Sequence, residues 1–299
     1  MKATVVIVTY NRFALLKECL ECVEQQKRKF DYVVIVDNKC TDGTTDYLKN
    51  YVDKYHIIFE AENGGGAKGF YDGIKYVHDN LSTDWILLID DDAMLDKNYL
   101  EEIINAATIM PEIKAFSGSV VTDGKIDMSH RKHLVLDKDF RLVPVSINEY
   151  SKKFFEYDLS SFCGLIFHSS LVDEIGYPKA EYFIWYDDSE YSLRIREKTK
   201  LLNINSAQIN HKTKLSNRSA ALNWRGYYGT RNGGDLIKRY GTKKHFSRFV
   251  KRIRLAQIKN LIFYALTFNN IYKHNSNLYR DALHDLENEK LGFNPKYHA

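Results

Sequence analysis

The chain has 299 residues, enough for one large α/β domain or two average domains with a substantial buried core. Hydrophobic residues make up 44% of the chain and charged residues 27%, which excludes a wholly disordered protein. The 43 Lys and Arg residues exceed the 39 Asp and Glu residues by too little to indicate nucleic-acid binding, and no RNA-binding motif occurs.

The first hundred residues alternate between strand and helix patterns. Short apolar or β-branched runs predict buried strands, at 3–8, 32–36, 57–59 and 85–89. Apolar residues at helical spacing lie between them, such as Leu16, Cys19, Leu20 and Val23 after the first strand. This order predicts a mostly parallel sheet flanked by helices, with ligands at the carboxyl ends of the strands.

The remaining chain is less regular. Residues 115–211 are expected to be partly antiparallel, with strands at 162–167 and 202–209, and helical patterns run from 225 to the C-terminus. Cys19 and Cys22 lie in a helical pattern and no second pair completes a zinc site, so reduced, structural thiols are expected. No signal peptide precedes the first strand, and the late apolar run 261–266 is far below the ~20 residues that span a bilayer. A cytoplasmic protein is therefore predicted.

Three consecutive carboxylates, Asp90, Asp91 and Asp92, follow the fourth strand. Their mutual repulsion favours a bound cation, and hard oxygen ligands suit Mg²⁺ or Mn²⁺. If the segment is extended, Asp90 and Asp92 share one side and can hold one metal, while Asp91 points elsewhere. A solvated acidic turn is the alternative.

Polar residues also end the first two strands. Asp37, followed by Asn38, has a carboxylate that can accept a hydrogen bond from a uracil or thymine ring, and Arg12, after Thr9, Tyr10 and Asn11, can meet a phosphate. Each can instead be a capping or turn residue. The loop 63–67, Asn-Gly-Gly-Gly-Ala, opens a helix and can bring backbone N–H groups to an anion, although it matches no phosphate-loop motif and can equally be a tight turn.

Trp185 and Tyr186 stand directly before Asp187 and Asp188. Aromatic rings suit the apolar faces of sugars, and a carboxylate beside an acceptor hydroxyl can act as a general base. His211 near a later strand end can be a third metal ligand or a structural histidine.

Together these motifs resemble inverting nucleotide-sugar glycosyltransferases of family 2, which have the GT-A fold. The resemblance covers roughly residues 3–211, and the forms N-G-G-G-A-K-G-F and D-D-D-A resemble the branch of bacterial galactofuranosyltransferases and rhamnosyltransferases. It implies a nucleotide-sugar-binding region at 1–114, an acceptor-binding and catalytic region at 115–215 and a basic, mostly helical region at 216–299.

The resemblance also implies residue roles. Asp90, Asp92 and His211 would bind Mn²⁺ or Mg²⁺, Asp188 would be the catalytic base, and Asp187 would bind the acceptor with Trp185 and Tyr186. In the family Trp usually precedes the Asp pair directly, so the intervening Tyr186 is a departure. The donor would be bound by Thr9, Tyr10, Asn11, Arg12, Asp37, Asn38, Gly65, Gly66, Lys68 and Asp91.

The implied reaction is metal-dependent transfer of galactofuranose from its uridine diphosphate donor to a lipid-linked bacterial cell-surface glycan. The alternatives are rhamnosyl transfer from a thymidine diphosphate donor, a sugar-phosphate nucleotidyltransferase and a non-catalytic carbohydrate-binding module. Residues 225–259 hold 11 Lys and Arg residues against one acidic residue, Asp235. We expect this region, with Trp224, Tyr227, Tyr228, Tyr240 and Phe249, to approach the inner face of an anionic membrane. A solvated basic helix is the alternative, and the sequence is compatible with a homo-oligomer.

Overall fold

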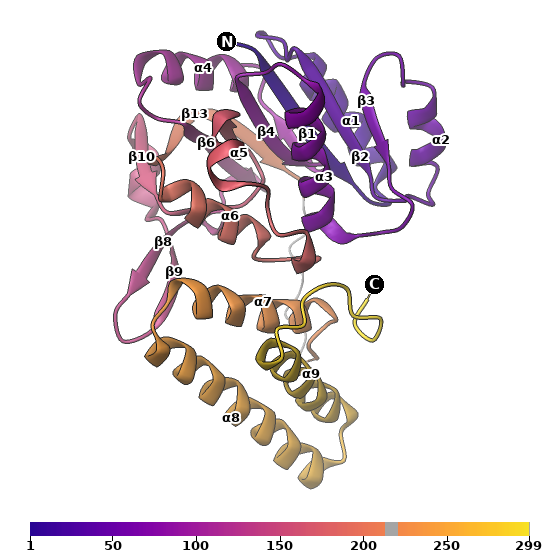
Figure 1. The fold of residues 1–299 in the computed structure, drawn as a ribbon, viewed down its shortest axis with the longest axis vertical. Coiled ribbons are helices and arrows are strands. Elements are labelled where there is room, and N and C mark those ends of the chain that lie inside the picture. The colour runs from indigo at the N-terminus through magenta and orange to yellow at the C-terminus, as the bar shows by residue number, and fades with distance from the viewer. Residues whose placement is uncertain (213–220, 299) are drawn as a thin grey trace. The chain divides into compact units, whose positions relative to one another are not determined.

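A computed structural model describes residues 1–212 and 221–298 of the chain. The described residues form two compact units (Figure 1). The first contains Met1–Leu134, Leu142–Lys179 and the residues from Asp188 to the end of strand β13 (Leu201–His211). The second contains Val135–Arg141, Ala180–Asp187 and the described residues from 221 onward.

One mixed sheet of ten strands runs through the first unit. Eight of them lie side by side in the order β10 (Phe154–Tyr157), β13, β6 (Ala115–Thr122), β12 (Leu165–His168), β4 (Trp85–Asp90), β1 (Ala3–Thr9), β2 (Tyr32–Asp37) and β3 (His56–Phe59). Two short strands extend it, β5 (Ala93–Leu95) beside β13 and β7 (Lys125–Ile126) beside β6. The strands β4, β1, β2 and β3 are parallel, whereas β12 runs antiparallel to both of its neighbours.

Helices cover both faces of this sheet because its central strands are apolar on both sides. On β1, Val5 and Ile7 pack into one buried cluster, and Val6 and Val8 pack into another. The first cluster includes side chains of α1 (Phe13–Glu24), α2 (Thr44–Lys49) and α4 (Tyr99–Ile109). The second includes side chains of α3 (Gly65–Asn80), α5 (Ser170–Ile175) and α6 (Asp187–Arg196).

A small second sheet has the order β11-β8-β9, with β11 (Leu159–Ser160), β8 (Arg131–Leu136) and β9 (Phe140–Pro144). Arg131, at the start of β8, is fully buried. Its guanidinium donates to the carbonyls of Gly118 (2.8 Å) and Cys163 (3.0 Å) and to Ser117 Oγ (2.8 Å), so it ties β8 to the main sheet. Three short 3-10 turns complete the connections, η1 (Met128–His130), η2 (Ile147–Ser151) and η3 (Ala180–Tyr182).

The second unit is mostly helical, with α7 (Arg225–Tyr240), α8 (Lys243–Thr267) and α9 (Asn270–Glu287). Its core has two apolar clusters, one around Tyr227, Tyr228 and Leu278 and one around Phe249 and Leu286. Across the part of the chain that the structure describes, no helix combines the length and apolar character needed to cross a membrane.

These findings confirm the predicted fold class, a mostly parallel sheet flanked by helices with helices after it. One strand boundary was wrong: the strand expected at 162–167 begins only at Leu165, because Gly164 adopts a positive φ of 86°. The expected membrane-facing aromatics are also corrected, since Tyr227, Tyr228 and Phe249 are buried in the core of the second unit.

Candidate functional site

The carboxyl ends of β1, β2 and β4 bring the predicted polar residues of the first unit to one edge of the sheet. The parallel register sets Thr9 beside Asp37 and Val8 beside Asp90. Thr9 Oγ1 donates to Asp91 Oδ2 at 2.7 Å, and both side chains are buried. The sequence order therefore produces a shared polar edge, as parallel strands require.

Arg12 and the acidic run form a compact ionic group. Arg12 Nη1 lies 3.1 Å from Asp91 Oδ1 and 2.6 Å from Asp92 Oδ2. Only Asp90 belongs to β4, and Asp91 and Asp92 form a turn before β5. The alternation expected of an extended segment does not hold here, which is why the Arg12 side chain contacts two consecutive carboxylates.

Burial and mutual repulsion control the protonation of these carboxyl groups. Withdrawal from water and the charges of Asp92 and Asp91 raise the pKa of Asp90 to about 7. Burial also raises the pKa of Asp91 to about 6, against the opposing effects of Arg12 and Thr9. Burial acts in the same direction on Asp92, but the hydrogen bond and charge of His211 and the charge of Arg12 outweigh it and lower its pKa.

His211 reaches the acidic run through strand pairing. Its strand β13 is antiparallel to β5, which sets His211 beside Ala93, and Lys212 N donates to the carbonyl of Asp92 at 2.9 Å. His211 Nε2 consequently lies 3.2 Å from Asp92 Oδ1. Burial acts to lower the pKa of His211, but the contact with Asp92 prevails and raises it.

A second pair of side chains close to His211, Asp127 and His130, was missed in the sequence. Ligand atoms of Asp127, His130 and His211 all lie within 4.8 Å of one another. His130 Nε2 is 3.5 Å from Asp127 Oδ2, and the two imidazole rings meet edge to face at 5.0 Å. The spacing Asp127-x-x-His130 was the available signal, but it is too short and common to indicate a site by itself.

Among the described residues, the cluster whose ligand atoms lie close enough to share a metal ion is Asp127, His130 and His211, and of the predicted ligands Asp90, Asp92 and His211 only His211 belongs to it. His211 Nδ1 is buried and makes no hydrogen bond with any described residue, while Asp92 Oδ1 has His211 Nε2 as its neighbour at 3.2 Å. Carboxylate oxygens are the protein ligands that Mg²⁺ and Mn²⁺ prefer, whereas imidazole nitrogens are typical ligands of transition metals. The raised pKa values of Asp90 and Asp91 mark an excess of negative charge that a cation would relieve.

The Gly-rich loop is held by Asn38. Its side chain accepts from Gly64 N at 3.1 Å and donates to the carbonyl of Gly65 at 2.9 Å. Gly65 has a positive φ of 79°, which an L side chain rarely adopts, and α3 begins at this residue. Asn38 thus fixes the start of α3, with Gly66 next along the helix.

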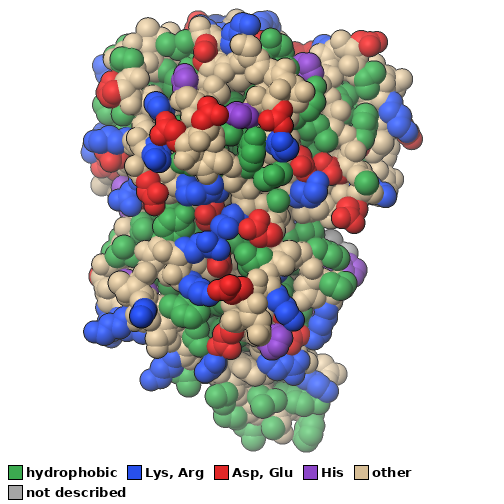
Figure 2. All heavy atoms as spheres, viewed as in Figure 1, with side chains coloured by type: hydrophobic (Ala, Val, Ile, Leu, Met, Phe, Trp, Pro, Cys, Tyr) green, Lys and Arg blue, Asp and Glu red, His purple; other side chains and the backbone are tan. Residues whose placement is uncertain are grey.

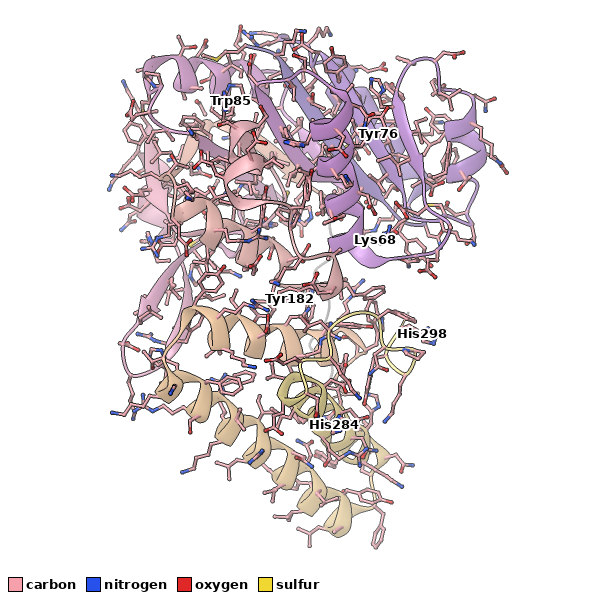
Figure 3. The ribbon with its side chains drawn as sticks, in the orientation of Figure 1. Lys68, Tyr76, Trp85, Tyr182, His284 and His298 are labelled. Carbon is pink, nitrogen blue, oxygen red and sulfur yellow. The ribbon has the colours of Figure 1, made fainter. Side chains whose placement is uncertain are left out.

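Three other residues predicted to bind the donor, Asp37, Asn11 and Lys68, already have protein partners. Asp37 Oδ1 accepts from Cys40 N at 2.8 Å, so the turn role that the sequence allowed is present. Asn11 Oδ1 accepts from Thr41 N at 2.7 Å, and Tyr10 is exposed. Lys68, near the start of α3 (Figure 3), pairs with Glu60 at 2.7 Å and with Asp72 at 2.5 Å.

Asp188 lies in the first turn of α6, anchored within the first unit by two serines. Ser192 Oγ donates to the Asp188 carbonyl at 2.8 Å and accepts from Ser160 N at 3.0 Å. The neighbouring Ser161 bonds His130 Nδ1 through its Oγ at 2.7 Å. Short bonds to two consecutive serines therefore link the helix of Asp188 to the histidine pair. Burial raises the pKa of Asp188, against the charge of Lys132.

Trp185 and Tyr186 belong to the second unit with Asp187, which is buried. Both aromatic residues have positive φ, 66° and 69°. The buried Asn232 of α7 donates to the carbonyl of Trp185 at 2.9 Å and to that of Ile184 at 3.0 Å. Glycines allow α7 to approach these rings closely. A Cβ at Gly229 would lie 2.8 Å from the Trp185 ring, and one at Gly233 would lie 3.1 Å from the Tyr186 ring.

Curated relatives match part of the chain. The galactofuranosyltransferase GlfT1 of Mycolicibacterium smegmatis is 26% identical over 193 residues, which are 64% of this chain and 64% of that protein. A poly(ribitol-phosphate) beta-glucosyltransferase of Bacillus spizizenii is 37% identical over 98 residues, 31% of this chain and 15% of its own length. The chain thus spans less than two thirds of either relative.

Solved structures match nearly the whole chain. The crystal structure of GalNAc-T7 with UDP, GalNAc and Mn²⁺ has a TM-score of 0.65 at 14% identity, over 95% of this chain and 54% of that one. The S. aureus TarS 1-349 structure in complex with UDP-GlcNAc has a TM-score of 0.54 at 15% identity, over 97% and 93%. At these identities the likeness shows the fold, which is that of GT-A glycosyltransferases.

The family model described as "Glycosyl transferase family 2" matches residues 4–176. This range is more than half of the chain and contains the strand ends, the Gly-rich loop and the acidic run. The chain therefore belongs to glycosyl transferase family 2.

Proposed function

We propose that this glycosyltransferase transfers galactofuranose from uridine diphosphate galactofuranose, with inversion, to a lipid-linked bacterial cell-surface glycan. The observation that carries the proposal is the group of Arg12, Asp91, Asp92 and His211 at the strand ends, inside the region that matches the family. The donor sugar is supported by the galactofuranosyltransferase of M. smegmatis, and the uridine nucleotide by the ligands of the two solved neighbours.

In this proposal the polar edge of the first unit binds the donor. Thr9, Arg12 and Asp37 hold the nucleotide, and the loop beginning α3 presents backbone N–H groups to the diphosphate. Arg12 has a flexible, half-exposed side chain, so it can exchange its carboxylate partners for phosphate oxygens. Tyr10, Asn11, Asn38, Gly65, Gly66, Lys68 and Asp91 complete the donor-binding set.

Asp90, Asp92 and His211 would hold Mn²⁺ or Mg²⁺. When bound, such a cation supplies positive charge against the negative charge that develops on the departing diphosphate. Asp92 is the residue best prepared for this role, since its carboxylate remains ionised and its Oδ1 atom faces His211.

Asp188 would be the general base. Its raised pKa brings it closer to neutrality, which favours taking the proton of the acceptor hydroxyl as that oxygen attacks the anomeric carbon. Asp187, Trp185 and Tyr186 would bind the acceptor. One displacement on the face opposite the leaving group requires no covalent intermediate and inverts the anomeric configuration. The lipid-linked acceptor would also bring the protein to the inner face of the cell membrane.

Nucleotide protection and donor hydrolysis test the proposal. The full chain is incubated with Mn²⁺ or Mg²⁺ and UDP or dTDP, and the thermal midpoint is measured. Protection by UDP, together with release of UDP from uridine diphosphate galactofuranose and not from other sugar donors, is expected. Protection by dTDP alone, with turnover of dTDP-rhamnose, would replace the donor by its rhamnosyl alternative. Release of pyrophosphate would indicate nucleotidyl transfer instead.

A further inference from the structure

The end of the α8–α9 hairpin carries a group of exposed apolar side chains, which we call the apolar tip. It consists of Leu261, Ile262, Phe263, Leu266, Phe268 and Ile271. In Figure 2 green side chains gather at this end of the hairpin, at the bottom of the view. Residues 261–266 are apolar at every position and so surround the helix, whereas packing against α9 can cover only one stripe. Folding of the hairpin therefore does not account for the apolar tip.

Phe268 strengthens this argument. It follows α8 in the left-handed conformation, with φ of 54°, where Gly or Asn is the usual residue. Its side chain is nevertheless 79% exposed, so burial within the chain does not compensate for the unfavourable backbone. A bulky apolar residue at this position is explained by contact with something outside the chain.

Charge identifies the kind of surface that fits. Residues 243–280 contain nine of the chain's 43 Lys and Arg residues and none of its 39 Asp and Glu residues, so the rest of the chain is acidic overall. Two of these cations border the apolar tip: Lys259 Nζ lies 5.7 Å from the Phe263 ring, and Lys273 Nζ lies 5.3 Å from the Tyr264 ring. A second copy of the same hairpin would repel this charge, whereas anionic headgroups would attract it.

We propose that the apolar tip inserts into the headgroup region of an anionic membrane, with the surrounding Lys and Arg side chains on the lipid phosphates. A helical run of six residues is about 9 Å long, which agrees with the roughly 5–10 Å depth of interfacial apolar faces. The inference deepens the proposed function and rests on it for the membrane-linked acceptor. It moves the membrane contact from the region 225–259, where Tyr227, Tyr228 and Phe249 are buried, to the end of the hairpin.

Vesicle flotation of the full chain tests the inference. Wild-type protein is expected to bind vesicles of phosphatidylcholine with phosphatidylglycerol at least tenfold more tightly than vesicles of phosphatidylcholine alone. The double substitution Leu266→Ser/Phe268→Ser should weaken this binding at least tenfold. Ile109→Ser is the matched control, because Ile109 is 79% exposed, as Phe268 is, but lies on α4, and it should bind as wild type does.

Phe268→Gly separates membrane contact from folding. Glycine relieves the left-handed backbone, so the thermal midpoint should not fall, while vesicle binding should weaken. Undiminished binding by the double variant, or equal binding to both vesicles, would overturn the inference. The inference would also be overturned if the wild-type protein bound no vesicles but formed a dimer that the substitutions Leu266→Ser/Phe268→Ser dissociate. Donor hydrolysis in solution should be unchanged by all these variants, so a failed donor assay and a failed vesicle assay bear on different proposals.

Discussion

Asn232 holds the backbone that carries Trp185 and Tyr186, and its replacement tests how this segment keeps its conformation. The side chain has no exposed surface, and its amide nitrogen lies 2.9–3.0 Å from three carbonyls, those of Tyr182, Ile184 and Trp185. Its Oδ1 atom accepts from Arg231 Nε at 3.0 Å. Every polar atom of the amide is therefore used.

The expected loss follows from these contacts. An amide has two N–H groups, so two carbonyls are fully bonded at a time. Asn232→Ala removes those two bonds at about 1 kcal/mol each and leaves buried groups unsatisfied at roughly 1–3 kcal/mol. We expect the free energy of unfolding to fall by about 3 kcal/mol. Asn232→Asp, which keeps the shape but turns acceptor oxygens toward the carbonyls, should be no better.

Urea unfolding followed by tryptophan fluorescence measures the effect. Asn260→Ala is the control, since Asn260 Nδ2 donates to the Ala256 carbonyl one turn earlier in α8, and its loss should change stability by about 0.5 kcal/mol or less. Because the altered segment carries the proposed acceptor platform, the KM for the acceptor should rise while donor hydrolysis is kept. A stability loss below about 1 kcal/mol for Asn232→Ala, or a fully stable Asn232→Asp variant, would refute the reasoning.

Three further predictions concern the first unit. Gly73→Ala should lower the thermal midpoint, because the new Cβ would lie 2.4 Å from Val6 Cγ1. Gly66→Ala is the control in the same helix: its Cβ would meet nothing within 4 Å, so the thermal midpoint should rise slightly. With metal removed by a chelator, the free energy of unfolding should fall as the pH rises from about 4 to about 7. The pKa of Asp90 is about 7 in the folded chain and near 4 in the unfolded chain, so between these values the folded chain binds one more proton than the unfolded chain. Asp90→Asn should make the thermal midpoint depend less on pH in this range. Asp188→Asn should lower the rate of transfer at least a hundredfold while UDP still raises the thermal midpoint, and Asp92→Ala should remove the metal dependence of that rise. Loss of the UDP effect in Asp188→Asn, with an unchanged metal dependence in Asp92→Ala, would contradict the proposed roles.

The sequence predicts the strand ends well because their placement follows from local patterns. Apolar runs of strand length identified β1, β2 and β4, and parallel pairing then requires their carboxyl ends to share an edge. Thr9, Asp37 and Asp90 meet there for this reason. The helical spacing of Leu16, Cys19, Leu20 and Val23 likewise predicted α1, where all four are buried.

Residues that reach the site through the pairing of distant strands could not be predicted from local sequence patterns. Asp127 and His130 reach His211 because β7 pairs with β6 and β6 pairs with β13, whose register shifts between Ile204 and Gln208. The sequence left both a turn and an extended segment open for Asp91 and Asp92, because nothing in three aspartates distinguishes a turn from a strand. The burial of Tyr227 and Tyr228 could have been predicted, because Trp224, Tyr227 and Tyr228 have the spacing of one helix face. That spacing would have argued against placing Tyr227 and Tyr228 on a membrane surface.

The charges at the strand ends explain why a divalent cation suits this edge better than another basic side chain. Arg12 pairs with Asp91 and Asp92 and His211 pairs with Asp92, while these two basic groups act on Asp90 only through their charges. These two groups lower the pKa of Asp92 but leave the pKa values of Asp90 and Asp91 raised, so they balance only part of the negative charge. A further Lys or Arg would add one charge and a long side chain to a buried space. A small ion with two charges and several ligands would balance the remainder in less volume, and it would leave Arg12 for the proposed contact with a phosphate.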